Sequence, residues 1–387
     1  MMSRPRQLLI AGLVVHAVIG TMSIVRSGRP AGDFDRYYEI ASSPGRPYVD
    51  YAVEHPLGTL LLFKAFAPTP HGRRSFGLAV VTANLAADTL IVLALLWGWG
   101  EVAAACFALA VIPMIEVLFN RIDLWSMAAA TLALAAWRRD RRSVTAVALA
   151  VGGSLKLWPL LFTTSLLTPR RDRPSGGTFQ LGRVPAWPIA VFVAAAVALA
   201  GAAWLVAGVQ GMLQVLTFRG ARGWQIESVV GSVMRLFDHS PIRLESGSWR
   251  MGEMNRVTAI LLFAAAAPVS LWSFWRGARS ARVGAGWLAS VSTLLVLSAL
   301  FSVQYVGWLV PGAAIAWVEG DRRAALIAAV AVVLTALFWN RYDDVMSGAT
   351  LALLLVVLRN IVVGALAVMT LKTLARASAE PFSPGRT

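Results

Sequence analysis

The chain has 387 residues, of which 57% are hydrophobic and only 14% are charged, and its formal net charge is +15. Soluble domains carry about 25% charged residues, so this composition excludes an ordinary soluble protein. Apolar runs long enough to cross about 30 Å of hydrocarbon recur along the sequence, and they predict one polytopic all-α membrane domain over residues 1–387.

The positive charge has an ordinary explanation in such a protein. The arginines gather in short clusters between apolar runs, which is the positive-inside pattern of cytoplasmic loops. The lipid bilayer is therefore an expected partner, and nucleic acid is not. Cys106 is the single cysteine and the four histidines lack metal-ligand spacing, so we expect no disulfide, metal or cofactor.

The first apolar run, residues 8–25, follows Arg4 and Arg6, and no small-residue cleavage site comes after it. It predicts an uncleaved transmembrane helix rather than a signal peptide. Because the arginines precede the helix, we expect the amino terminus in the cytoplasm.

The next segment, residues 26–74, holds the densest polar cluster of the chain. It includes GDFDRYYEIASSPGRPYVDYAVEHPLG, which packs five carboxylates and four tyrosines between two apolar runs. Asp33, Arg36 and Tyr37 have i, i+3, i+4 spacing, so they could share one face of a short interfacial helix. The alternative is a solvated loop whose carboxylates only balance nearby arginines. A general base must be a carboxylate or a histidine here, and the choices are Asp33, Asp35, Asp50, Glu54 and His55.

Arginine clusters determine the expected topology of the later runs. RRDRR at residues 138–142 and PRRDR at residues 169–173 should both face the cytoplasm, but one continuous helix over residues 143–168 would place them on opposite sides. The stretch VGGSLKLWP lies at mid-span, and its paired glycines, Lys156 and proline weaken or break a helix. Two half-helices that meet near Lys156 would return the chain to the cytoplasm.

The expected bundle has about eleven or twelve transmembrane helices, cytoplasmic termini, and two long extracytoplasmic segments at residues 26–74 and 209–255. The apolar runs fall at about residues 8–25, 75–97, 102–119, 122–137, 143–168, 185–208, 256–275, 283–302, 304–318, 322–339 and 347–371.

Lys156 and the NRID turn provide candidate site residues on the outer side. A lone lysine in an apolar stretch is a candidate ligand for a phosphate oxygen, and snorkelling to the interface is the structural alternative. Arg121 and Asp123 lie at the start of a helix. Asp123 could simply cap that helix while Arg121 pairs with a nearby carboxylate, and a site role is the other interpretation.

The second outer segment contains FRGARGWQIES. Arg222 could clamp a phosphate together with Arg219 through bidentate hydrogen bonds. Non-specific binding of anionic lipid headgroups is the alternative. The polar group also includes Gln225, Glu227 and Ser228.

The polar residues that a membrane-spanning fold does not require are therefore expected to lie together on the outer face of the membrane. Gln304 and Tyr305 add to this group at the SVQYVGWLVP junction, where a tyrosine is usually an interfacial belt residue. The sequence has no Gly-rich nucleotide-binding loop. Because no nucleotide pool exists outside, an activated group used on that face must arrive on a lipid.

In this order, PYVDYAVEHPL, NRIDLW, SLKLWPLL, RGWQIES and SVQYVGWLVP resemble glycosyltransferase family 87, over about Gly32 to Pro311. That family has the GT-C fold and occurs in many actinobacterial membrane proteins. Asp33 and Tyr37 match its Asp-x-x-x-Tyr. EHPLG departs from its Glu-Tyr-Pro-Pro-Leu, with His55 in place of the tyrosine and Leu57 in place of the second proline, and this departure concerns acceptor preference more than fold. Further family-like positions are Pro47, Tyr48, Asp50, Glu54, Arg121, Asp123, Lys156, Arg222, Gln225, Glu227, Ser228, Gln304 and Tyr305.

The resemblance implies a GT-C-like membrane glycosyltransferase of the plasma (inner) membrane. It would move a sugar, mannose being the first expectation, from a polyprenyl-phosphate donor to a cell-envelope glycolipid or glycan on the outer face. Asp33 would be the base of an inverting displacement, with Asp35 or Asp50 as alternatives. Lys156 and Arg222, with Arg121, would stabilise the leaving phosphate. The remaining expected substrate-binding residues are Gln225, Glu227, Gln304, Tyr305, Tyr37, Glu54 and His55.

Two other functions fit the same pattern. A polytopic transporter or lipid flippase would also use broken helices and an intramembrane lysine. A non-catalytic subunit of envelope assembly would keep the fold without the chemistry. The sequence does not specify the sugar, the acceptor, the linkage or the oligomeric state.

Overall fold

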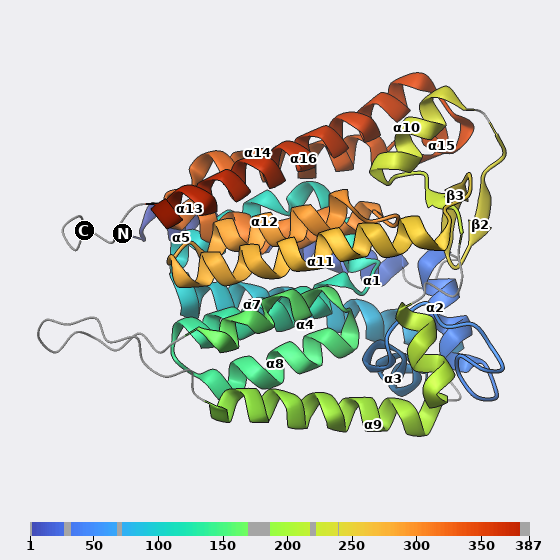
Figure 1. Cartoon of the computed structure of the whole chain (residues 1–387), viewed down its shortest axis with the longest axis horizontal. Helices are drawn as coiled ribbons and strands as arrows, with labels where there is room; N and C mark the ends of the chain where they lie inside the picture. Colours follow the sequence, from blue (N-terminus) through green and yellow to red (C-terminus); the bar gives the residue numbers. More distant parts are fainter. Residues whose placement is uncertain are drawn as a thin grey trace, which may run out of the picture. The chain divides into compact units, whose positions relative to one another are not determined.

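The structure is a computed structural model that describes residues 2–26, 32–67, 72–168, 186–216, 222–238 and 240–379 (Figure 1). The chain divides into two compact units. Unit 1 comprises Met1–Arg222 and Arg243–Trp249, and unit 2 comprises Gly223–Ile242 and Arg250–Thr387. The organisation as a single domain stays a prediction.

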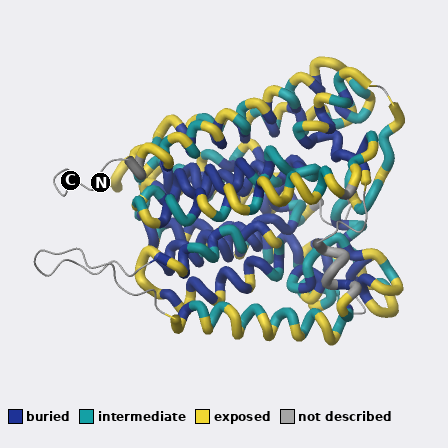
Figure 2. Tube along the Cα trace, in the orientation of Figure 1, coloured by how far each residue is buried: buried dark blue, intermediate teal, exposed yellow. Residues whose placement is uncertain are grey.

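Unit 1 is a helical bundle whose first helices are joined by a partly helical loop. The loop carries α2 and α3, and the bundle centres on α7, which is buried along almost its whole length (Figure 2). Its alanines let neighbouring helices approach closely. The elements are α1 (Arg4–Arg26), α2 (Gly32–Ser42), α3 (Leu57–Phe66), α4 (Gly72–Trp99), α5 (Glu101–Ala110), η1 (Ile112–Met114), α6 (Ile115–Phe119), α7 (Asp123–Arg138), α8 (Arg142–Leu155), η2 (Trp158–Leu167) and α9 (Ala186–Leu216).

The predicted break near Lys156 is confirmed. α8 ends at Leu155, Lys156 adopts an extended backbone (φ −150°, ψ 145°), and the 3-10 helix η2 runs back along α8. Thr168, after η2, accepts hydrogen bonds from Arg142, the first residue of α8, and from Trp137 Nε1, in the last turn of α7. The segment therefore enters and leaves at one end of the bundle, as the arginine clusters require.

Unit 2 contains the remaining helices and short strands that the sequence analysis did not anticipate. Strand β1 pairs antiparallel with β3, with Trp224 opposite Met251 and Gln225 opposite Arg250. The elements are β1 (Trp224–Gln225), α10 (Val229–Phe237), β3 (Ser248–Met251, whose first two residues belong to unit 1), α11 (Arg256–Arg279), α12 (Val283–Val296), η4 (Val303–Leu309), α13 (Val310–Val318), α14 (Arg322–Trp339), α15 (Tyr342–Ser347) and α16 (Thr350–Ala379). Strand β2 (Arg243–Glu245) lies in unit 1.

The chain is a polytopic all-α membrane protein. Among the described residues, six helices are long and apolar enough to span a membrane, or seven if the bent α5–α6 pair is one span. Large apolar side chains on the outer surface of α9 and α11 are exposed, such as Leu205 at 78% and Phe263 at 69%. Lipid accommodates such side chains, whereas water does not. The expected eleven or twelve crossings stay a prediction, because the other apolar helices are shorter.

Candidate functional site in unit 1

Two ion pairs in unit 1 join four of the residues that the sequence singles out. Asp33, in the first turn of α2, forms an ion pair with Arg121, in which Asp33 Oδ2 lies 2.9 Å from Arg121 Nη2. Lys156, at the carboxyl end of α8, donates from Nζ to Asp123 Oδ1 at 2.7 Å. Arg121 and Asp123 belong to one turn between α6 and α7, so the two ion pairs are neighbours. We call Asp33, Arg121, Asp123 and Lys156 the unit 1 cluster.

Burial differs sharply between the two carboxylates of the cluster. The side chain of Asp123 is 1% exposed and that of Lys156 is 12% exposed, whereas Asp33 is 39% exposed. In a buried ion pair each charge compensates the other, and either charge buried without its partner would strongly destabilise the fold. Asp33 is the carboxylate that a substrate can reach from outside the protein.

Glycines explain how the broken helix brings Lys156 to this place. A Cβ on Gly152 would lie 3.1 Å from Pro159 Cβ, and a Cβ on Gly58 would lie 2.7 Å from the carbonyl oxygen of Ser154. The first glycine lets η2 pack on α8, and the second lets the start of α3 pack on the end of α8. Thr59 Oγ1 then donates to the carbonyl of Leu155 at 2.8 Å. Both contacts lie next to the break at Lys156.

The predicted short helix at Asp33, Arg36 and Tyr37 is confirmed as α2, and its position at the membrane interface stays a prediction. Arg36 donates to both carboxylate oxygens of Glu54 and also to the carbonyl of Ala52. Burial lowers the pKa of Arg36. The hydrogen bonds with Glu54 and Glu39 together raise this pKa by more than burial lowers it, so the net shift is upward. Arg36 therefore binds the end of the first loop to α2.

The other candidate carboxylates of the first loop have partners away from the cluster. Asp35 pairs with Arg73, and Asp50 accepts a hydrogen bond from the backbone N–H of Arg46 at 2.7 Å. Of the carboxylates proposed as a base, the structure thus brings Asp33 to the cluster and places Asp35 and Asp50 in other ion pairs.

Tyr37 and His55 lie in the apolar packing of the first loop. The ring of Tyr37 stacks on Phe63 at 4.8 Å, and His55 meets both rings edge-on. Tyr48 Oη donates to the carbonyl of His55 at 2.5 Å. These contacts favour a packing role for Tyr37 and His55.

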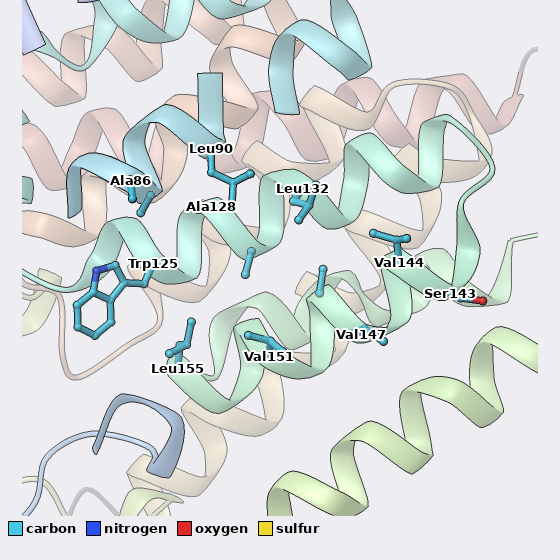
Figure 3. A pocket seen from close by; sticks show the side chains of 13 residues that line it. Ala86, Leu90, Trp125, Ala128, Leu132, Ser143, Val144, Val147, Val151 and Leu155 are labelled. Atoms are coloured by element: carbon cyan, nitrogen blue, oxygen red, sulfur yellow. The ribbon is translucent and has the colours of Figure 1, made fainter. Parts of the chain in front are cut away.

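An apolar groove runs along the bundle beside the cluster (Figure 3). It lies between α4, α7 and α8 and has a volume of about 650 Å³, within the range of pockets that hold small ligands. Trp125 and Leu155 line one end and Ser143 lines the other (Figure 3). Trp125 lies two residues after Asp123 in the chain, and Leu155 directly precedes Lys156. The groove therefore ends next to the charged cluster. Its lining also includes Ala86, Ala87, Leu90, Ala128, Ala129, Leu132, Val144, Val147, Ala148 and Val151.

Arg222 does not join the cluster through any bond that the structure describes. Its residue is exposed, and its backbone N–H donates to Glu245 Oε2 at 3.1 Å. Arg219 lies outside the described residues. The expected phosphate clamp of Arg222 with Arg219 stays a prediction.

The remaining predicted residues form a separate polar assembly in unit 2. Gln225 Nε2 donates to Ser302 Oγ at 2.6 Å, and Glu227 Oε1 accepts from Tyr342 Oη at 2.8 Å. Ser228 caps α10 by accepting from the N–H of Gly231. Gln304 and Tyr305 belong to η4, where Gln304 is buried and Tyr305 stacks on Trp308 at 4.2 Å.

Sequence reasoning missed two buried residues of unit 2 that hold this assembly. Arg359 Nη2 donates to the backbone carbonyl of Glu227 at 2.8 Å, and Asn360 Nδ2 donates to the same oxygen at 3.2 Å. The guanidinium of Arg359 lies 3.8 Å from the ring centre of Phe301. The sequence did carry a signal for them, because Arg359 and Asn360 lie side by side inside the apolar run at 347–371. Polar residues inside membrane helices are rare and usually have a structural or functional role.

Within the described part of the chain, no three His, Cys, Asp or Glu side chains gather as metal ligands would. The cluster instead offers one reachable carboxylate and two cations. Such a set can accept a proton and stabilise an oxyanion.

No family model matches the chain, and no curated protein matches it. Among solved structures, the chain is similar to the archaeal oligosaccharyltransferase AglB from Archaeoglobus fulgidus, which was solved in complex with an inhibitory peptide and a dolichol-phosphate. The sequences are 13% identical, the TM-score is 0.35, and the match covers 97% of this chain and 56% of that chain. The present chain thus spans little more than half of that structure's length, and at this TM-score the likeness does not establish a shared fold.

Proposed function

We propose that the protein is a membrane glycosyltransferase that moves a sugar from a polyprenyl-phosphate donor to a hydroxyl of a cell-envelope glycolipid or glycan on the outer face. The observation that carries the proposal is the position of the unit 1 cluster at the end of an apolar groove. A partly exposed carboxylate, two cations and an apolar groove are what such a donor and its reaction need.

The proposed chemistry uses Asp33 as the general base. Its carboxylate takes the proton of the acceptor hydroxyl while that oxygen bonds to the anomeric carbon of the sugar. The bond from the anomeric carbon to the phosphate oxygen breaks in the same step, which inverts the configuration. The electron pair stays with the phosphate, which leaves as the polyprenyl phosphate anion.

The cations of the cluster meet the charge that develops on the leaving phosphate. Lys156 and Arg121 are mostly buried, so water screens their charges little. In the structure each cation is paired with a carboxylate. A phosphate that attracts Arg121 would draw it away from Asp33, and this would leave the base available when the donor is bound.

The groove accounts for the lipid part of the donor. Its lining is almost entirely alanine, valine and leucine, and it lies along membrane helices. A polyprenyl chain placed there loses contact with neighbouring lipid but gains close apolar contacts, and its phosphate is held at the cluster. Holding the donor in this way lowers the entropic cost of bringing it to the acceptor.

Mannose as the sugar, the GT-C fold and the part played by Arg222 belong to this proposal through the resemblance to glycosyltransferase family 87. The same resemblance supports an actinobacterial type of envelope acceptor. In unit 2, Gln225, Glu227, Gln304 and Tyr305 are proposed to bind the substrate, because they match family-like positions and lie in a buried polar assembly.

The experiment that tests the proposed function supplies the purified protein in lipid vesicles with radiolabelled polyprenyl-phosphate sugars and an extract of envelope glycolipids. We expect label to move to the glycolipids from at least one donor, with mannose tested first. A wild-type protein that transfers no sugar from any polyprenyl phosphate, but moves the intact donor across the bilayer, would replace the proposal with a flippase.

Variants that fill the groove test its part in donor binding. Val147→Phe and Val151→Phe place a ring in the groove, so we expect the KM for a long-chain donor to rise at least tenfold. A donor analogue with a short chain should be affected much less. Val193→Phe is the matched control, because Val193 lies on α9 with 50% of its surface exposed and does not line the groove. Equal effects of all three variants would contradict a donor site in the groove.

A further inference from the structure

Helix α4 carries a polar side chain, Asn84, that neither the sequence analysis nor the proposed chemistry uses. Asn84 is fully buried, and it lies in the middle of a largely apolar helix. Its amide Nδ2 donates to the backbone carbonyl of Phe119 at 2.7 Å and to that of Arg121 at 2.8 Å.

These two carbonyls lie where helical hydrogen bonding stops. α6 ends at Phe119 and α7 begins at Asp123, so the regular helical hydrogen-bond pattern is interrupted at the carbonyls of Phe119 and Arg121. An asparagine amide has two N–H groups and can satisfy both at once. A polar group inside a membrane helix is costly, which favours a specific role for Asn84 over a tolerated accident.

The turn that Asn84 holds is the one that supplies Arg121 to the unit 1 cluster. One of the two hydrogen bonds goes to the backbone of Arg121 itself, and the guanidinium of that residue lies 2.9 Å from Asp33. Fixing the backbone of Arg121 fixes the point from which its side chain reaches the base and the proposed phosphate. Asn84 touches none of the reacting groups.

We propose that Asn84 is a positioning residue, which holds Arg121 where it can pair with Asp33 and meet the phosphate of the donor. The inference rests on the proposed function for its kinetic consequence. Its geometric consequence, the approach of residues 33 and 121, does not depend on what the protein does.

The bond pattern one turn further along α4 supports an organising role for this face of the helix. Asp88, at i+4 from Asn84, pairs with His16 Nδ1 at 2.8 Å, and His16 Nε2 donates to the carbonyl of Ala108 at 2.9 Å. Ala108 lies just before the bend between α5 and α6, and Phe119, whose carbonyl accepts from Asn84, is the last residue of the bent span. Successive turns of α4 therefore hold both sides of the bent span.

The first test measures geometry without any activity. In a Cys106→Ala background, the double variant Asp33→Cys, Arg121→Cys should be cross-linked by a short bifunctional thiol reagent that replaces the reach of the arginine side chain, because Arg121 Nη2 lies 2.9 Å from Asp33 Oδ2 in the structure. Adding Asn84→Ala or Asn84→Asp should slow this cross-link at least fivefold, since neither side chain can donate to the two carbonyls. Thr89→Ala is the matched control: Thr89 lies on α4, is exposed, and bonds only within its own helix through the carbonyl of Leu85. Cross-linking of the Asn84 variants at the control rate would overturn the proposal.

The second test measures transfer. A displacement of about 1 Å in a catalytic group can lower the rate of a reaction about 100-fold, so Asn84→Ala should lower kcat between about 10-fold and 100-fold, with a smaller change in the KM of the donor. In an Arg121→Ala background the same substitution should lower kcat no further, because the group that it positions is gone. Losses that multiply would show that Asn84 acts through general stability and would overturn the proposal.

The two tests separate the inference from the proposed function. A wild-type protein that transfers no sugar overturns the glycosyltransferase proposal, while the cross-linking result still decides whether Asn84 positions Arg121. A wild-type protein that transfers sugar, with variants that cross-link normally, overturns the role of Asn84 alone.

Discussion

Lys156 and Asp123 form a buried ion pair in unit 1. Asp123 is almost fully buried at the amino end of α7, where the helix dipole favours its negative charge. Lys156 neutralises that charge and is itself held at the break of α8. A lysine whose side chain extended to the membrane interface would not pair with a buried carboxylate, so this ion pair argues against simple snorkelling of Lys156.

Removing one member of this pair should therefore destabilise the protein strongly. We expect Lys156→Met to lower the free energy of unfolding by about 3–5 kcal/mol, because a buried carboxylate is left without its cation. The double variant Lys156→Met, Asp123→Leu should recover most of that loss, but it should not recover transfer. Thermal unfolding in detergent measures the first effect and the vesicle assay the second.

Lys64→Met is the control for this prediction. Lys64 is only partly buried and reaches the carbonyls of Ala41 and Ser43 at 3.5 Å, so its loss should change stability little. A double variant that transfers sugar at the wild-type rate would contradict a role for Lys156 in the reaction.

At the residue scale, the sequence predicted the members of the cluster better than the groups that hold them. Arg121, Asp123 and Lys156 are charges beside or inside apolar runs, and such charges need partners. Asn84 and Arg359 carried the same signal, but a sequence does not show which backbone carbonyls lack a donor. That information exists only once α6 and α7, or α10 and α16, are packed.

At the element scale, the broken helix is the clearest agreement between sequence and structure. The arginine clusters required the chain to turn back within residues 143–168, and the glycines, Lys156 and proline of VGGSLKLWP supplied the means. The return of Thr168 to Arg142 and Trp137 confirms it. The short strands of unit 2 had no such signal, because two to four residues carry too little periodicity to predict a strand.

Close packing of α3 on the end of α8 gives a prediction for one glycine. A Cβ at Gly58 would lie 2.7 Å from the backbone oxygen of Ser154 and 2.9 Å from its carbonyl carbon, and backbone cannot move aside as a side chain can. We expect Gly58→Ala to lower the free energy of unfolding by about 1–3 kcal/mol, as overpacking does. Because α3 would shift next to Lys156, transfer should fall as well.

Gly201→Ala is the matched control for that change. A Cβ at Gly201, in the middle of α9, meets nothing within 4 Å. Helical propensity then favours alanine, so the variant should be as stable as the wild type or slightly more so. Thermal unfolding of the two variants side by side checks the difference, and equal melting temperatures would contradict the close contact between α3 and α8.

At the scale of the whole molecule, the membrane topology follows from charge and from the reversal at Lys156. Since α8 and η2 bring the chain back to the end where α7 finished, the two arginine clusters at residues 138–142 and 169–173 are expected on one side. The cytoplasm is the side that the positive-inside rule assigns to them, so we expect the unit 1 cluster on the outer side.

Reporter fusions test this topology. Fusions after Arg142 and after Arg173 should report the cytoplasm, and a fusion after Ser228 should report the exterior. The physical reason is that each cluster of arginines resists transfer across the membrane. A cytoplasmic signal after only one of the first two positions would contradict the reversal at Lys156, and a cytoplasmic signal after Ser228 would contradict an outer site.

The central claim is that Asp33 is the base of a sugar transfer on the outer face, and the most direct measurement compares Asp33→Asn with Asp35→Asn in vesicles supplied with the radiolabelled donor. Both variants keep the size of the side chain, and both carboxylates lie in the first turn of α2 beside an arginine. The account predicts that Asp33→Asn lowers kcat by about 100-fold or more, as loss of a general base does, while Asp35→Asn stays within about threefold of the wild type and both variants unfold at the wild-type temperature. Wild-type transfer by Asp33→Asn, or an equal loss in the two variants, would contradict it.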